Sequence, residues 1–156
     1  MPNGHGDNPG VIAPPPLIYA VPLMAGLYVD RANPFPIMPR PFAEWIGGAL
    51  IVFAVVLSLA AFAQFWRKHT AMMPYKPTTT IIQSGPFRIT RNPLYLSMTL
   101  IYVGVALVMN TVWPLLLLPL VLLIMHRGVI QREERYLEQK FGDEYISYKS
   151  RVRRWI

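Results

Sequence analysis

Two short polar segments in this hydrophobic chain contain residues that could bind a charged ligand. The first lies in residues 84–95 and includes Arg88, Arg91, Asn92 and Pro93. Proline is favoured at the first position of a helix and asparagine at the N-cap, so we expect a helix that begins at Pro93. Its free N–H groups and the positive end of its dipole would attract an anion beside the two arginines. A capped helix with two arginines that reach toward lipid headgroups explains the same residues.

The second segment carries two adjacent carboxylates, Glu133 and Glu134, between Arg132 and Arg135. Neighbouring side chains on a helix point about 100° apart, so we expect one carboxylate to face the protein and the other to face solvent or Arg135. Taken alone, the pair fits an ordinary solvated helix face. A carboxylate can also hold a ribose hydroxyl or an ammonium group, and an arginine-rich helix start can hold a carboxylate. Together the two segments predict a site for an amino-acid-like nucleotide cofactor, because such a cofactor carries a ribose hydroxyl, an ammonium group and a carboxylate.

Long uncharged runs indicate that these segments are positioned by membrane helices. The chain has 156 residues, which suggests a single domain (1–156), and only 15% of them are charged, against roughly 25% in soluble domains. Residues 45–66 and 92–125 contain no Asp, Glu, Lys, Arg or His. Runs above about 18 apolar residues are long enough to cross a bilayer as a helix.

We expect an all-α bundle of about four transmembrane helices. A weaker span covers residues 11–29 and a clear one covers 45–66. The run 92–125 would form a helix of about 50 Å, too long for one crossing, so we divide it at Asn110. The result is a helical hairpin of spans 93–109 and 112–125, each arm short for a full crossing.

Basic residues indicate which face of this bundle is cytosolic. With four crossings, the N-terminus, residues 67–92 and the tail 127–156 share one side, which carries every Lys and Arg except Arg31 and Arg40. Cytosolic loops are enriched in Lys and Arg, so we expect an integral, multi-pass membrane protein with both termini in the cytosol. The same rule explains the net charge of +7 without nucleic-acid binding, and we expect no nucleic-acid partner.

The tail should form two cytosolic helices that lie at the membrane interface. Gly142 should end the first helix and Asp143 should cap the second. The second helix would place Tyr145, Tyr148, Val152 and Trp155 on one stripe. We expect this stripe to turn toward the membrane, with basic residues near anionic headgroups of the membrane lipids.

The absence of cysteine and the small number of histidines exclude several types of catalytic and metal site. No cysteine is present, so disulfides, thiolate nucleophiles and Cys-based metal sites are excluded, and we expect no metal ion. The N-terminus lacks the positive region of a cleaved signal peptide. The histidines are His5, His69 and His126, of which the last two should lie at span ends.

The two polar segments together resemble a known enzyme family. The residues Gly85-Pro86-Phe87-Arg88-x-x-Arg91-Asn92-Pro93-x-Tyr95 resemble the G-P-[YF]-R-x-x-R-[HN]-P-x-Y signature of the isoprenylcysteine carboxyl methyltransferase family. Related membrane phospholipid methyltransferases carry a similar segment. The residues Glu133-Glu134-x-x-Leu137-x-x-x-Phe141-Gly142-x-x-Tyr145-x-x-Tyr148 are similar to that family's E-E-x-x-L-x-x-x-F-G-x-x-Y-x-x-Y ending. The resemblance covers residues 77–153 and implies a helical membrane enzyme that binds S-adenosyl-L-methionine without a Rossmann domain.

The resemblance also implies the site residues, because in that family the cofactor lies between the signature and the helix that follows the last span. Carried over to this chain, the cofactor-binding residues are Thr79, Thr80, Ile81, Ile82, Phe87, Asn92, Pro93, Leu94, Tyr95, Glu133 and Glu134. Arg91 would be the catalytic residue, either organising the site or holding an anionic acceptor. Some positions depart from the family pattern and leave the acceptor unassigned, a prenylated cysteine in particular: Asn92 replaces histidine, Phe87 replaces tyrosine, Thr79 replaces the histidine of many eukaryotic members and Ser97 replaces glycine.

The implied reaction is direct methyl transfer from a sulfonium to a lipophilic or lipidated acceptor that enters from the bilayer. An ionised carboxylate acceptor needs no general base, so alignment and desolvation supply the catalysis. A lipid amine or a phenol would need a base, and His126 or Glu134 would be the candidates. Two other functions fit the same spans: a non-enzymatic lipid-binding membrane protein, and a membrane reductase of the steroid-reductase type that uses NADPH.

Overall fold

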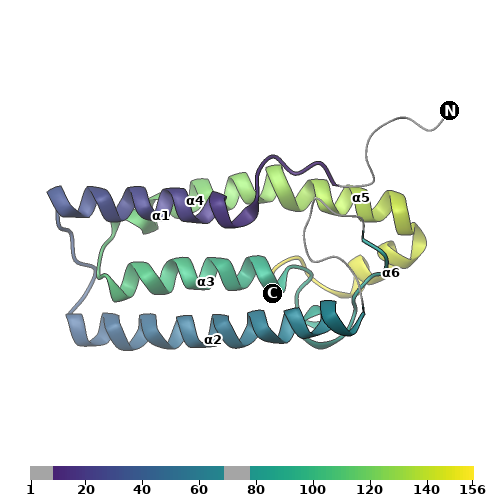
Figure 1. The fold of residues 1–156 in the computed structure, drawn as a ribbon, viewed down its shortest axis with the longest axis horizontal. Helices are drawn as coiled ribbons and strands as arrows, with labels where there is room; N and C mark the ends of the chain where they lie inside the picture. Colours follow the sequence, from purple (N-terminus) through teal and green to yellow (C-terminus); the bar gives the residue numbers. More distant parts are fainter. Residues whose placement is uncertain (1–8, 69–77) are drawn as a thin grey trace.

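Four long helices run back and forth along one axis in the computed structural model, which describes residues 9–68 and 78–156 (Figure 1). They are α1 (Pro15–Ala32), α2 (Arg40–Arg67), α3 (Pro93–Val108) and α4 (Trp113–Met125). The described residues contain no strand, and a single parallel bridge joins Thr90 to Arg153. The expected all-α helical bundle, with α3 and α4 as a hairpin, is therefore confirmed.

The chain after α4 continues without a break into its C-terminal helices. A π-helical turn, η2 (His126–Ile130), connects α4 to α5 (Gln131–Phe141), and α6 (Asp143–Arg151) follows after Gly142. A short 3-10 helix, η1 (Gly85–Arg88), precedes α3. Gly142 has a φ of 51°, a left-handed conformation that ends α5 as expected. Asp143, however, is the first residue of α6 rather than its cap, and no side chain caps this helix.

The first predicted span starts too early. Residues 11–14 are not helical, and the backbone N–H of Ile12 donates to the carbonyl of Gly128 in η2 at 3.2 Å. Pro14, at the N-cap, and Pro15, at the first helical position, mark the start of α1, because a proline at the first turn leaves no helical hydrogen bond unmade. The segment before α1 therefore packs across the start of the C-terminal region instead of extending the span.

Small residues allow the helices to approach closely. The buried residues of α2 are Ala43, Gly47, Ala54 and Ala61. A Cβ atom on Gly47 would lie 2.6 Å from the carbonyl oxygen of Gly104 in α3. Packing of this kind, with backbone against backbone, is the usual means of association between helices in lipid, where apolar contact alone gives little advantage.

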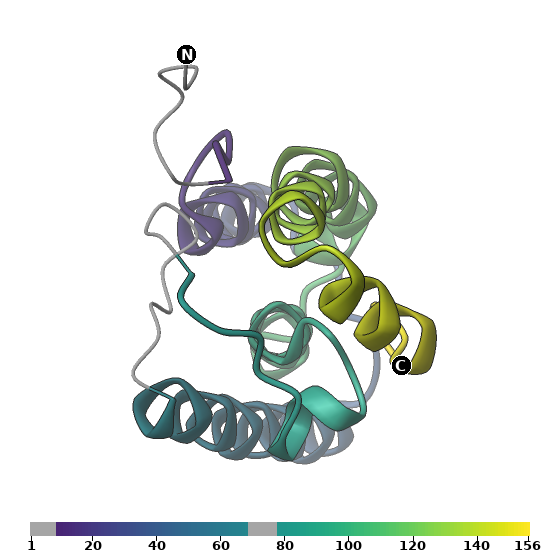
Figure 2. The same cartoon turned by 90° about the vertical axis from the view of Figure 1, so that its right-hand side faces the viewer.

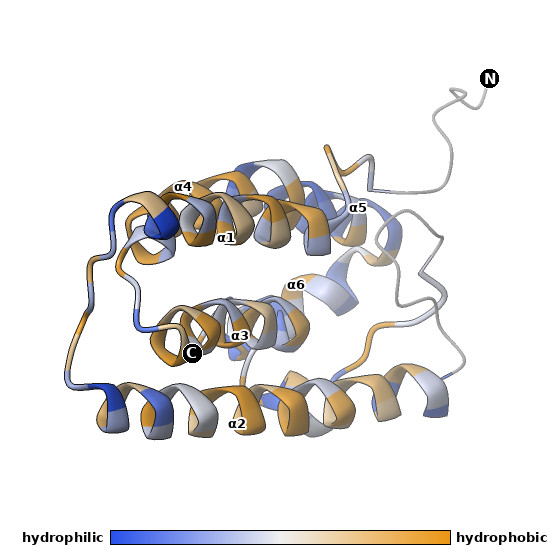
Figure 3. Cartoon of the chain, turned by 60° about the vertical axis from the view of Figure 1, so that its left-hand side comes forward, coloured by the Kyte–Doolittle hydropathy of each residue, from blue (hydrophilic) through white to orange (hydrophobic). Residues whose placement is uncertain are grey.

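The outer surface of the bundle is apolar, as expected for a membrane protein. Among the described residues, Arg40–Arg67 and the continuous helix Trp113–Phe141 are long and apolar enough to cross a membrane, and α3 is a shorter apolar helix. Large apolar side chains of α2, including Val52, Phe53 and Leu59, are exposed between Trp45 and Trp66 near its two ends. Figure 3 shows hydrophobic residues along all four helices and hydrophilic residues mostly at their ends. The number of crossings, four, remains a prediction.

The two ends of the bundle are built from different segments of the chain. At one end, Asn110 ties the α3–α4 turn to the α1–α2 loop, because its carboxamide oxygen accepts from the N–H of Ile37 and its amide donates to the carbonyl of Met38. At the opposite end lie the start of α1, the end of α2, residues 78–92, α5 and α6 (Figure 1). This second end gathers both polar segments that the sequence singled out.

Candidate functional site

A cavity opens at this second end, and Figure 2 views the molecule from that side. The strip 78–82, η1, the start of α3, α5 and α6 enclose a cavity of about 130 Å³ that is partly open to solvent. The cavity is lined by Pro9, Phe65, Thr78, Thr80, Ile81, Ile82, Phe87, Arg91, Asn92, Pro93, Leu94, Tyr95, Glu133, Glu134, Tyr136, Leu137, Tyr145 and Tyr148.

The structure brings nearly all of the predicted site residues to this cavity. Eleven of the twelve line it: Thr80, Ile81, Ile82, Phe87, Arg91, Asn92, Pro93, Leu94, Tyr95, Glu133 and Glu134. Thr79 is the exception, because its side chain is exposed and does not reach the wall.

The start of α3 forms as predicted, but Asn92 does not cap it through its side chain. Asn92 occupies the N-cap position and Pro93 the first helical position. The Asn92 amide instead donates to the carbonyl of Arg154 at 3.0 Å, and its own N–H donates to the hydroxyl of Thr90 at 3.2 Å. Asn92 therefore connects the cavity wall to the C-terminal segment.

Glu133 and Tyr95 meet across the cavity. The Tyr95 hydroxyl donates to Oε1 of Glu133 at 2.6 Å, a length typical of a charge-assisted bond. Burial raises the pKa of Glu133 to about 7; the Tyr95 hydrogen bond opposes the rise and the neighbouring Glu134 adds to it. Glu133 lies on α5, beyond Met125, where the apolar helix α4 ends. A carboxylate in this setting gains from a positively charged or hydroxyl-bearing ligand that restores its lost solvation.

The prediction that only one carboxylate faces the protein is wrong. Glu134 is buried and Glu133 is half-buried, and Oε1 of Glu134 lies 3.0 Å from Nη1 of Arg91. Arg154 donates to the same carboxylate through both Nε, at 2.9 Å, and Nη2, at 2.6 Å. Arg135 turns away and donates to the Gln131 carbonyl. Both carboxylates line the cavity, but their partners differ: Glu133 accepts from the Tyr95 hydroxyl, whereas Glu134 is paired with two arginines.

Arg91 is an unusual cation because it is buried and incompletely paired. Its side chain is 8% exposed. The Nε and Nη1 atoms have no hydrogen-bond partner among the described residues, although Nη1 is at ion-pair distance from Glu134. Burying an unpaired donor costs about 1–3 kcal/mol or more when it is charged. Arg91 lines the cavity, so its guanidinium is a candidate partner for an anion, although the two unpaired nitrogen atoms are themselves covered from solvent.

The aromatic face of α6 turns toward this cavity rather than toward the membrane, which corrects the expectation for Tyr145 and Tyr148. Both rings are buried against Ile81, and the Tyr148 hydroxyl donates to the Phe87 carbonyl at 2.7 Å. Burial raises the pKa of Tyr145 to about 12; Glu134 adds to the rise, and the Arg91 guanidinium, which hydrogen-bonds to Tyr145, opposes it. The stripe also ends early, because Val152 is extended and Trp155 lies beyond the helix.

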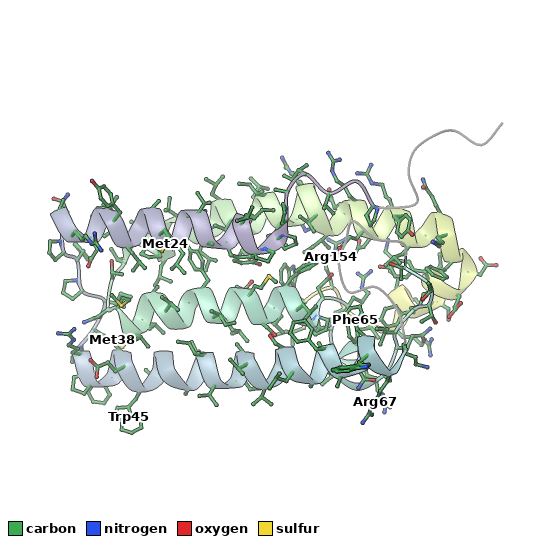
Figure 4. The ribbon with its side chains drawn as sticks, in the orientation of Figure 1. Met24, Met38, Trp45, Phe65, Arg67 and Arg154 are labelled. Atoms are coloured by element: carbon green, nitrogen blue, oxygen red, sulfur yellow. The ribbon has the colours of Figure 1, made fainter. Side chains whose placement is uncertain are left out.

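Sequence reasoning missed the residues that complete the site from distant elements. Arg154 was only one of many basic tail residues, and nothing in its spacing singled it out. Phe65, from α2, packs edge-to-face against Phe87 with ring centroids 5.5 Å apart, and Tyr136 accepts from the N–H of Thr78 at 3.3 Å. Figure 4 labels Phe65 and Arg154 at this end of the bundle.

Neither of the two candidate general bases, His126 and Glu134, is placed to accept a proton from a ligand in the cavity. His126 is 3.2 Å from the Gln131 amide and does not line the cavity. His5 and His69 lie outside the described residues. Glu134 lines the cavity but is held by two arginines.

Comparison with known proteins locates the chain among membrane enzymes. Residues 42–144 match the phospholipid methyltransferase family. The chain is 43% identical over 63 residues to an uncharacterized protein of Haemophilus influenzae, a match that covers 40% of this chain and 100% of that protein. It is also 26% identical over 109 residues to the cobalt-zinc-cadmium resistance protein CzcN of Cupriavidus metallidurans, covering 69% of this chain and 49% of that protein. No solved structure matches.

Proposed function

The chain belongs to the phospholipid methyltransferase family of membrane methyltransferases, and from that premise we propose that it uses S-adenosyl-L-methionine to methylate a lipophilic acceptor. The acceptor would reach the cavity from the bilayer, as a lipid or a lipidated molecule. We further propose that the end of the bundle that holds the cavity faces the cytosol, where the cofactor is made. The concentration of basic residues at that end supports this orientation.

One observation carries the proposal: Glu133, Tyr95 and the incompletely paired Arg91 converge on a single cavity. S-adenosyl-L-methionine carries an ammonium group, ribose hydroxyls and a carboxylate. Glu133 offers a carboxylate for the first two, and Arg91 offers unpaired donors for the third. Apolar and aromatic side chains such as Ile81, Ile82 and Phe87 supply a surface of the kind an adenine ring stacks on. The residues present therefore fit the cofactor.

In this mechanism the cofactor would supply the methyl group, and the side chains of the cavity would orient the ligand and exclude water. Tyr95 holds the Glu133 carboxylate in one orientation, and Glu133 orients the bound ligand through its hydroxyl or ammonium groups. Leu94 and Phe65 give the cavity an apolar side, suited to a hydrocarbon chain. Alignment of donor and acceptor, together with exclusion of water, is the main contribution that such a site can make.

We propose a carboxylate as the acceptor group. Such an acceptor is already ionised and needs no base, whereas an amine or phenol must lose a proton. His126 lies off the cavity, and Glu134 is neutralised by Arg91 and Arg154. Neither of these two candidate bases is free to take a proton from an acceptor, which supports an acceptor that is already an anion. Arg91 would then hold or organise that anion.

Transfer of labelled methyl groups tests the proposal. Membranes that contain the protein are incubated with methyl-labelled S-adenosyl-L-methionine and a lipid extract, and the label in the lipid fraction is measured. We expect incorporation that Glu133→Ala and Tyr95→Ala abolish while both variants still insert into the membrane. The label should be released by alkaline hydrolysis, as a methyl ester is and a methylamine is not. A lipid-binding or scaffold protein predicts no incorporation and tolerance of both substitutions.

A further inference from the structure

The last residues of the chain lie against the segment that carries Arg91. Thr90 and Arg153 form a parallel bridge, in which the Arg91 N–H donates to the Arg153 carbonyl at 3.0 Å. The carbonyl of Arg154 accepts two further bonds, from the Thr90 hydroxyl at 3.1 Å and from the Asn92 amide at 3.0 Å. The backbone of residues 153–154 is thereby fixed beside the cavity, although it lies outside the region matched to the family.

This attachment directs the two neighbouring arginine side chains differently. Arg153 is exposed, whereas Arg154 reaches inward and binds both carboxylate oxygens of Glu134. A two-pronged guanidinium–carboxylate contact is stronger and more directional than a single hydrogen bond. Figure 4 labels Arg154 near the start of α3, and its side chain is half-buried.

Arg91 and Arg154 compete for the same carboxylate. Oxygen Oε1 of Glu134 lies 3.0 Å from Nη1 of Arg91 and accepts from Nε of Arg154 at 2.9 Å. Arg154 donates to both oxygens, whereas the buried Arg91 has no hydrogen-bond partner for its Nε and Nη1 atoms among the described residues. Without Arg154, Glu134 would have one cation left, and the best arrangement for both groups would be a full pair between Arg91 and Glu134.

We propose that Arg154 is a positioning residue: by occupying Glu134 it keeps the donors of Arg91 available for a carboxylate of a bound ligand. The inference rests on the proposed function. That carboxylate belongs either to the methionine part of the cofactor or to the acceptor, and the two sources give different results below.

Three variants of the full-length, detergent-purified protein separate this role from a general one in folding. Arg154→Met removes the guanidinium and keeps an unbranched side chain. Arg154→Lys retains a cation with single-point contact and should restore part of the function. Arg153→Met is the matched control, because it removes the same charge from the neighbouring, exposed side chain.

Binding of two nucleosides tests whether Arg91 binds the carboxylate of the cofactor. S-adenosylhomocysteine contains the amino-acid group, and methylthioadenosine lacks it. If Arg91 holds the cofactor carboxylate, Arg154→Met weakens S-adenosylhomocysteine binding about tenfold or more, leaves methylthioadenosine within about twofold, and Arg154→Lys falls between. Arg153→Met should match the wild type for both nucleosides.

The kinetics of methyl transfer test whether Arg91 binds the carboxylate of the acceptor. If Arg91 holds the acceptor, Arg154→Met binds S-adenosylhomocysteine normally but needs about tenfold more lipid extract for half-maximal transfer at saturating S-adenosyl-L-methionine. The inference is overturned if Arg154→Met behaves like Arg153→Met in both assays. It is also overturned if both nucleosides weaken equally, since that marks a structural role. A wild-type protein that binds neither nucleoside refutes the proposed function and removes the basis of this inference.

Discussion

Replacing Glu133 with glutamine tests the chemistry of the cavity, because the change removes a charge and preserves the shape. In the ligand-free protein the pKa of this carboxyl is about 7, raised chiefly by burial. A positively charged or hydroxyl-bearing ligand binds the ionised form better, so binding must release the proton wherever the pH is below 7. The fraction ionised rises about tenfold between pH 6 and pH 8 for a group with this pKa, and the affinity should rise by the same factor.

This pH dependence distinguishes Glu133 from an ordinary surface glutamate. A group with an unperturbed pKa of 4.5 is fully ionised across this range and gives no pH dependence. Because burial raises the folded-state pKa of Glu133 above that value, its proton is held more tightly, and affinity falls as the pH decreases through 7. Glu133→Gln should bind about ten- to hundredfold more weakly at pH 8, the loss expected for a charge-assisted hydrogen bond, and should lose the Glu133 contribution to the pH dependence.

Isothermal titration of S-adenosylhomocysteine at pH 6, 7 and 8 measures both effects. The amino group of the ligand titrates alike in every variant, so the difference between wild type and Glu133→Gln isolates the carboxylate. Glu138→Gln, on the same helix but away from the cavity lining and paired with Lys149, is the matched control and should follow the wild type. Equal affinity and equal pH dependence in Glu133→Gln and wild type would refute the assignment of this residue to the ligand.

Other substitutions test the remaining parts of the account. Tyr95→Phe removes the 2.6 Å bond to Glu133 and should weaken S-adenosylhomocysteine binding by about tenfold with little change in melting temperature; an unchanged affinity would show that the hydroxyl does not position Glu133. Gly47→Leu places a side chain where a Cβ already lies 2.6 Å from the Gly104 carbonyl, so it should lower the thermal stability in detergent sharply or prevent folding. Gly48→Leu, at the adjacent glycine with no atom within 4 Å of its Cβ, should be tolerated, and equal stability of the two variants would contradict the α2–α3 packing. Gly142→Ala forces a φ of 51° and a ψ of −126° on a residue with a side chain, at a cost of about 1–3 kcal/mol. The melting temperature should fall, and the cofactor affinity should fall with it because α6 places Tyr145 at the cavity. An unchanged melting temperature would contradict the strain argument.

Local rules predicted the parts of the fold that depend on neighbouring residues. Pro93 begins α3 and Gly142 ends α5 because proline fixes φ at a helix start and glycine tolerates a left-handed one. The apolar run 92–125, divided at Asn110, likewise forms the predicted hairpin of α3 and α4. The resemblance in residues 85–95 and 133–148 located the cavity, to which eleven of the twelve predicted residues contribute.

The remaining features depend on contacts between distant residues that no local pattern specifies. The aromatic stripe of α6 could bury itself equally well in lipid or in protein, and the hydrogen bond from Tyr148 to Phe87 spans 61 positions. The Asn92 side chain prefers the Arg154 carbonyl to its own helix because the C-terminal segment lies alongside it. Arg154 is one of eight basic residues after position 126, and only its partner, Glu134, distinguishes it.

The most direct test of the central claim is a pair of titrations of the wild-type protein in detergent, one with S-adenosyl-L-methionine and one with NADPH. The cavity formed by Glu133, Tyr95 and Arg91 predicts saturable binding of S-adenosyl-L-methionine with one site per chain and no binding of NADPH. Binding of NADPH alone would contradict the account and identify a reductase.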